Sequence, residues 1–295
     1  MAAGMAAASL AALTTSQRSD GSWGRSAVPT ARIARTIFAA RSLQESEVLG
    51  GEPSLGRALD FLTGTAVVDG GGSVFGTRES VLSCYTGMLA LLFLRAGRSE
   101  AAVPLLEWIQ RYQPVRFGDR TYYRPRAEWG DYLRHRYGGC MAATTCLLGL
   151  VPTMTALAEG RRAGLASESG QQVDAFRALL EERRLMFGRG VEVIPLSGRT
   201  KKDPSGTRWL LPAFPLNYVF DLIALVEAGR CLGVPWAAMS EATGLIWSWQ
   251  LADGGWPMLG TRRIEPVYRP EPVGRSRQSH LITRRVQALG LPEQH

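Results

Sequence analysis

Apolar residues recur along the chain with the spacing of α-helices, and the helices come in pairs. In each pair, a first helix with a polar stripe is followed by a loop carrying glycine or an aromatic residue. A second helix, apolar on nearly all sides, follows the loop. The predicted first helices span 5–17, 55–62, 101–112, 173–187 and 237–250, and the second helices span 29–43, 79–97, 138–160, 216–233 and 278–290.

This pairing predicts a layered, all-α fold. A helix that is apolar all round is buried, whereas an amphipathic helix lies at the surface. The second helices should therefore form an inner layer and the first helices an outer one. About five to six such hairpins closing into a ring make an α/α toroid. We expect a single toroid domain over residues 1–295, with the N-terminal apolar run as a helix of the fold and not a signal peptide.

The long loops connect first helices to second helices and so lie at the N-terminal ends of the inner helices. Long loops on a rigid scaffold are common sites of function. The partial positive charge of helix N-termini favours an anionic group there. We therefore expect the mouth of the toroid at this end, with the basic loop 261–277 beside it.

Charge and composition narrow the classes of partner. The formal net charge is +8, and residues 262–285 hold seven arginines against two glutamates. A basic balance suits nucleic acid, an anionic membrane surface, a diphosphate or an acidic carrier protein, as well as a solvated face. Without a nucleic-acid-binding motif, we expect no nucleic-acid partner. A peripheral membrane contact stays open. No apolar run is long enough to span a membrane, and four cysteines without a CxxC pair point to the cytoplasm.

Two loops share a longer motif. QRSDGSWG stands at 17–24 and QLADGGWP at 250–257, and GGGSVFG at 70–76 is a degenerate copy. This motif resembles the QW-type repeat of terpenoid cyclases and the related protein prenyltransferases. Three inner-helix segments, CYTGMLALLFLRAG, CLLGLVPTMTALAEG and FPLNYVFDLIALVEA, are similar to bacterial prenyltransferase and squalene-oxidase repeat proteins. The resemblance covers about residues 17–260.

The resemblance implies a cofactor-independent cyclase or isomerase of secondary metabolism. Its substrate would be a polyene, a terpenoid or another apolar intermediate, free or linked to a diphosphate or a carrier. The chain departs from the family at the catalysts, because it lacks the DxDD acid motif and the DDxxD magnesium motif. An epoxide, enol or conjugated carbonyl is easier to activate than a plain alkene, so such a substrate suits a weaker acid.

Four residues are candidate catalysts. Asp221, predicted one turn into an inner helix with Tyr218 on the same face, could act as a general acid, since apolar surroundings favour a protonated carboxyl group. The alternative is a carboxylate paired with arginine or capping a neighbouring helix. His280 or Glu79 would take the final proton if the ring brings them to the same cavity as Asp221.

Aromatic and polar side chains near the inner-helix starts are candidates for substrate binding. Aromatic faces stabilise cations, and arginines can hold an anionic group. These candidates are Tyr85, Phe214, Trp209, Asn217, Arg78, Arg208 and Arg277. We expect Trp23 and Trp256, in contrast, to pack between repeats.

Two further functions remain open. Cys84, Cys140 and Cys146 could meet on neighbouring inner helices and bind zinc, which would indicate a lyase or transferase. Two residues before Cys84, however, stands Leu82, where protein prenyltransferases carry aspartate. The third possibility is a toroid without catalysis that binds a hydrophobic ligand or a partner protein.

Overall fold

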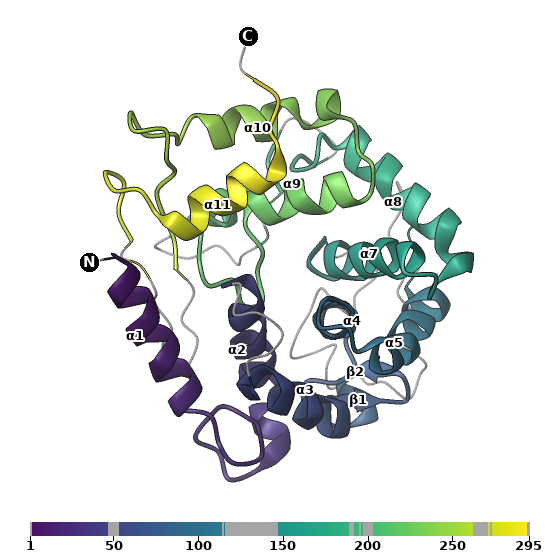
Figure 1. Cartoon of the computed structure of the whole chain (residues 1–295). Helices are drawn as coiled ribbons and strands as arrows, with labels where there is room; N and C mark the ends of the chain where they lie inside the picture. Colours follow the sequence, from purple (N-terminus) through teal and green to yellow (C-terminus); the bar gives the residue numbers. More distant parts are fainter. Residues whose placement is uncertain are drawn as a thin grey trace. The chain divides into compact units, whose positions relative to one another are not determined.

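The computed structural model describes residues 2–46, 53–113, 115, 147–188, 192–194, 196, 203–261, 271 and 273–293. Over these residues the fold is all-α, as predicted, with ten α-helices and one two-stranded sheet (Figure 1). No helix in this part of the chain combines the length and the apolar character that a membrane span requires.

The chain divides into two compact units. The middle unit comprises residues 16–176, and the C-terminal unit comprises residues 177–295 together with residues 1–15. A single toroid over residues 1–295 stays a prediction, and most of the basic loop 261–277 lies outside the described residues.

Five complete α-helices lie among the described residues of the middle unit. Its helices are α2 (Ile33–Glu45), α3 (Pro53–Ala66), α4 (Ser83–Arg95), α5 (Ser99–Tyr112) and α7 (Leu147–Arg162), with short 3-10 turns at Pro29–Arg32, Arg78–Ser80 and Ser167–Ser169. The strands β1 (Val67–Val68) and β2 (Gly71–Gly72) pair antiparallel, Val67 with Gly72. Helix α4 packs most extensively against α7 and α5, and it lies next to both in Figure 1.

The C-terminal unit holds the remaining helices. They are α1 (Ala2–Thr15), α9 (Leu222–Cys231), α10 (Ser240–Trp247) and α11 (His280–Leu289), with 3-10 turns at Arg208–Leu210 and Trp236–Met239. Helix α8 (Gly170–Glu182) begins in the middle unit and ends in the C-terminal unit. Each of the ten predicted helices has a counterpart among the described residues.

Two helix predictions need correction. The inner helix predicted from residue 216 begins only at Leu222, because Asp221 is extended (φ −103°, ψ 177°) and its side chain caps the helix by accepting the N–H of Ala224. The last inner helix, α11, is not apolar all round. Its buried residues, Ile282, Thr283, Val286 and Leu289, form a single stripe, and arginines occupy other sides of the helix.

Neighbouring helices of the middle unit that the sequence predicts as inner helices run in the same direction. On α2 and α4, the rings of Phe38 and Tyr85 lie 6.4 Å apart between centroids, and Gln44 Nε2 donates to Leu92 O at 2.8 Å. The residue numbers rise together along both helices. Successive hairpins that alternate an outer and an inner helix would place all their inner helices in the same direction, as α2 and α4 are.

Helices α4 and α7 repeat this arrangement at closer range. A Cβ added to Gly87 would lie 2.5 Å from the backbone nitrogen of Thr153, so the two backbones nearly touch. Further along, Arg95 Nη2 lies 2.8 Å from Glu159 Oε1. The helices α2, α4 and α7, which the sequence predicts as inner helices, therefore run side by side in one direction within this unit.

Candidate functional site

The loop at residues 17–23 is braced against the helix that follows it. Gln17 Nε2 donates to Gly21 O at 2.8 Å, and the backbone N–H of Trp23 donates to Thr36 Oγ1 on α2 at 3.1 Å. Gly21 adopts a positive φ of 85°, and Trp23 is completely buried. The end of the loop is therefore attached to α2 through the hydrogen bond from Trp23 to Thr36.

The loop at residues 250–256 has the same structure. Gln250 Nε2 donates to Gly254 O at 3.1 Å, Gly254 has a φ of 81°, and Trp256 N donates to Thr283 Oγ1 on α11 at 2.8 Å. Trp256 is also buried. Two sequence-similar loops in different units therefore form the same hydrogen bonds, and both tryptophans serve packing.

The degenerate third copy, at residues 70–76, keeps the hydrogen bond to a threonine of the following helix but has no tryptophan. Gly72 occupies the position of Trp23, and its N–H donates to Thr86 Oγ1 on α4 at 2.8 Å. A Cβ at Gly72 would lie 2.5 Å from the nitrogen of Thr86, so a larger residue has no space there. In all three loops, a threonine hydroxyl of the inner helix holds the loop.

Asp221 is fully engaged in hydrogen bonds. It is completely buried, and its carboxylate accepts from the N–H groups of Ala224 at 2.9 Å and Ala213 at 3.0 Å. Arg285 of α11 adds two more bonds, Nη2 to Oδ1 at 2.8 Å and Nη1 to Oδ2 at 2.9 Å. The acid role would require a proton to displace one of these four donors. Of the alternative, the geometry contains the arginine pair, whereas the helix that Asp221 caps is α9, which begins at the next residue.

The side chains expected around Asp221 lie on the loop before α9. Trp209 and Phe214 are buried, and Trp209 Nε1 donates to Ile194 O at 2.8 Å. Asn217 Oδ1 accepts the N–H of Tyr218 at 2.8 Å, and both residues are half-buried. Tyr218 therefore does not share a helical face with Asp221, which corrects the prediction, because the helix starts after both.

The two expected proton acceptors, His280 and Glu79, lie in different units. His280 is the exposed first residue of α11, and no hydrogen bond joins it to Asp221 in this part of the chain. Glu79 belongs to the middle unit and is also exposed. A hydrogen bond from its own backbone N–H, with a further one from Thr77, lowers the pKa of Glu79.

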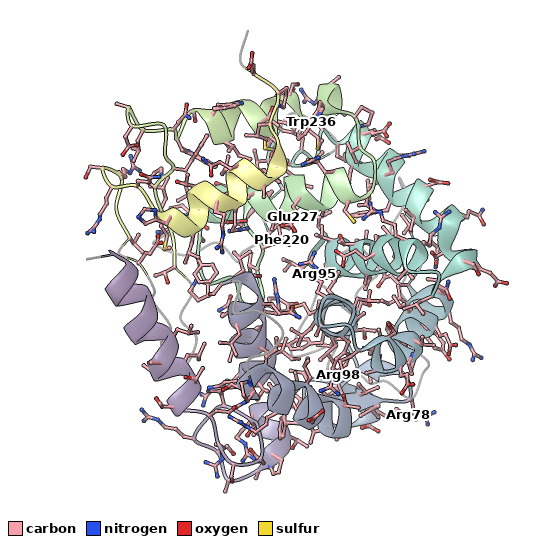
Figure 2. All side chains as sticks on the ribbon, in the orientation of Figure 1. Arg78, Arg95, Arg98, Phe220, Glu227 and Trp236 are labelled. Atoms are coloured by element: carbon pink, nitrogen blue, oxygen red, sulfur yellow. The ribbon has the colours of Figure 1, made fainter. Side chains whose placement is uncertain are left out.

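The candidate arginines are exposed. Arg78 pairs with Asp69, with 2.8 Å between Nε and Oδ2, and Figure 2 shows it at the outer edge of its unit, away from Arg95. Arg208 and Arg277 lie in the C-terminal unit, on the loop before α9 and just before α11. All three side chains therefore lie at the surface of their units.

The cysteine cluster cannot be placed as a whole. Cys84 is buried on α4, whereas Cys140 and Cys146 lie outside the described residues. Among the residues that are described, no three histidine, cysteine or acidic side chains come together as metal ligands.

A surface that the sequence analysis did not single out runs along α2, α4 and α7. On α4, Leu89 and Phe93 are completely buried, whereas Leu91 and Arg95, about half a turn away, are partly exposed. Corresponding stripes on the three helices form what we call the inner face: Ala34, Phe38, Arg41 and Glu45 on α2; Cys84, Met88, Leu91 and Arg95 on α4; Leu148, Pro152, Thr155 and Glu159 on α7. Cys84, Met88 and Thr155 are buried beneath this face, and its other side chains are at least partly exposed.

Apolar side chains make up most of the inner face, and its charges are paired. Arg41 Nη2 lies 3.2 Å from Glu45 Oε1, and Arg41 Nη1 lies 3.2 Å from Met88 Sδ. The side chains of Arg41 and Glu45 are only 21% and 18% exposed. Arg95 and Glu159 form the second pair, nearer the C-terminal ends of their helices.

The spacing of Arg41 and Glu45 could have identified this face. The two residues stand one turn apart on a helix whose pattern predicts burial, and buried charges are retained when they are paired. Their neighbour Met88, more than forty residues away in sequence, could not be inferred from spacing.

Comparison with known proteins adds little to this geometry. No family model and no curated protein matches the chain. One solved structure, described as the crystal structure of a protein from Actinoplanes, aligns over 99% of both chains at 16% identity with a TM-score of 0.37. At that TM-score the likeness supports no argument about fold or function.

Proposed function

We propose that the chain is an α/α toroid that binds an apolar small molecule on the inner face of the middle unit and acts on it as a cyclase or isomerase. The QW-like loops and the common direction of α2, α4 and α7 support the toroid. The reaction class comes from the resemblance of those loops to the repeats of terpenoid cyclases. The proposal requires no cofactor and no nucleic acid, and it places the protein in the cytoplasm.

One observation carries the proposal: the inner face combines an apolar surface with a few paired polar groups. Small-molecule sites are mostly apolar, with a small number of placed polar side chains. Phe38 supplies a partly exposed aromatic ring one turn before Arg41, and the buried Tyr85 packs against it with 6.4 Å between ring centroids. Such rings can stabilise positive charge that develops in a substrate.

The proposed reaction makes little use of a strong acid. Because Asp221 is held by four donors, we do not assign it the protonation step. Enclosure alone can promote ring closure by holding the reacting ends of a flexible chain together. A polyene activated by a conjugated carbonyl fits this mode, because its ring closure needs no protonation of a plain alkene.

The test uses defined linear probes. The protein is incubated with farnesal, which has a conjugated carbonyl, and with farnesol and squalene. Binding is read from thermal stabilisation, and conversion is read by mass spectrometry as new isomers of unchanged mass. We expect all binding to be lost in Leu91→Arg, which places a charge on the inner face.

Leu245→Arg is the matched control, because Leu245 is a half-buried leucine on the outer helix α10. It should bind as the unchanged protein does, and circular dichroism checks that both variants fold. Binding without new isomers would reject the cyclase and leave a binding protein. If no probe binds, or if Leu91→Arg binds normally, the inner face is not the site.

A further inference from the structure

We infer that the inner face selects ligands whose polar end is uncharged, such as an alcohol, a carbonyl or an amide, over ligands that end in a diphosphate. This inference rests on the proposed function, since it concerns the same surface. It decides between the free and diphosphate-linked substrates that the sequence leaves open.

The first argument is the charge balance of the face. Its charged side chains are two arginines and two glutamates, joined as Arg41 with Glu45 and Arg95 with Glu159. The formal sum is zero, although the whole chain carries +8. A diphosphate placed here would gain the guanidinium groups only by displacing glutamates that are already bound to them. The displaced carboxylates would remain close to the phosphate oxygens, and like charges at short range repel each other.

The second argument is the hydrogen-bonding character of the face. Guanidinium groups only donate and carboxylates only accept. A hydroxyl or amide can accept from the first and donate to the second without separating the pair.

The third argument is the height of the apolar surface. Along α7 the inner face is apolar from Leu148 to Pro152, about 6 Å at 1.5 Å per residue, before it reaches Glu159. Along α4 it is apolar from Cys84 to Leu91, about 10 Å, before it reaches Arg95. A ligand with an apolar body about 10 Å long would therefore place its polar end near the pair of Arg95 and Glu159.

The experiment compares farnesol with farnesyl diphosphate, which share the same apolar chain. Calorimetric dissociation constants are measured for the unchanged protein and for the double variant Glu45→Gln with Glu159→Gln. This variant keeps side-chain size and gives the face a formal charge of +2. We expect farnesol to bind the unchanged protein at least about tenfold more tightly than the diphosphate. In the variant this ratio should fall by about tenfold or reverse, and diphosphate binding should weaken with salt.

The inference is overturned if the unchanged protein prefers the diphosphate, or if the ratio is the same in the variant. If neither probe binds, the proposed function fails instead, and the preference fails with it. A variant that unfolds is recognised by its thermal transition, and the comparison in the unchanged protein still decides the question. The single variant Glu45→Gln then replaces the double one.

Discussion

Arg285 on α11 binds both carboxylate oxygens of Asp221, the residue that caps α9, at 2.8 and 2.9 Å. The same guanidinium donates to Ala213 O at 3.1 Å, and Ala213 N–H donates back to Asp221. One ion pair therefore joins two helices and the loop before α9. In this role Asp221 stabilises the C-terminal unit.

We expect replacement of Asp221 to reduce the stability of the fold, since the protonation step is not assigned to this residue. Asp221→Ala leaves Arg285, whose side chain is 13% exposed, without its carboxylate, and we expect the free energy of unfolding to fall by about 3–5 kcal/mol. Urea denaturation measures this loss. The double variant Asp221→Leu with Arg285→Met should lose clearly less, because it leaves no buried charge. Native stability in Asp221→Asn together with complete loss of turnover would instead support the acid role.

Close contact between α4 and α7 makes Gly87 sensitive to substitution. A methyl group at this position would lie 2.5 Å from Thr153 N, and backbone cannot move aside as a side chain can. We expect Gly87→Ala to lower the free energy of unfolding by about 1–3 kcal/mol. Gly64→Ala is the control, since Gly64 is a helical glycine of α3 with nothing within 4 Å, and it should stabilise by about 0.5–1 kcal/mol. Equal effects at both positions would argue against tight packing of α4 on α7.

The threonine braces of the QW-like loops can be tested at Thr283. Thr283→Val removes the acceptor of the buried Trp256 N–H, so we expect a loss of about 1–3 kcal/mol in the free energy of unfolding. Thr283→Ser keeps the hydroxyl and should recover most of this loss. Thr63→Val, on an exposed position of α3, should change stability by less than about 0.5 kcal/mol. A serine variant as unstable as the valine variant would point to lost packing.

The helices could be predicted because their periodic patterns are long. The loops that begin at Gln17 and Gln250 could be predicted because they share a sequence motif. The start of α9 was missed because an apolar run hides its cap: Asp221 continues the helical spacing, yet an aspartate that accepts the N–H three residues on marks a helix start. The partner of Asp221 could not be inferred either. Arg285 is one of seven arginines in its segment and lies 64 residues away.

The candidate site shows the same division. Arg41 and Glu45 carry a local signal, a charge pair one turn apart, whereas Met88 joins them only through the packing of α2 on α4. The spacing of residues along the sequence is enough to infer contacts within one helix. Contacts between helices depend on which faces pack, and a pattern that is apolar on most sides does not specify that face.

The first QW-like loop should lose stability in acid. Partial burial raises the pKa of Asp20, but hydrogen bonds from the hydroxyl and N–H of Ser22 and the charge of Arg32 together outweigh it, so the pKa lies below the usual aspartate value. The ionised form is thus favoured in the folded state. Its contribution is fully present above the unfolded pKa, near pH 4, and is lost as the pH falls through the lower folded pKa.

We therefore expect Asp20→Asn to destabilise the protein most at pH 7 and progressively less below about pH 4, where Asp20 itself becomes neutral. Urea midpoints at a series of pH values measure the difference. If Asp20→Asn destabilises the protein equally at every pH, the ionised carboxylate of Asp20 does not contribute to the stability of the loop.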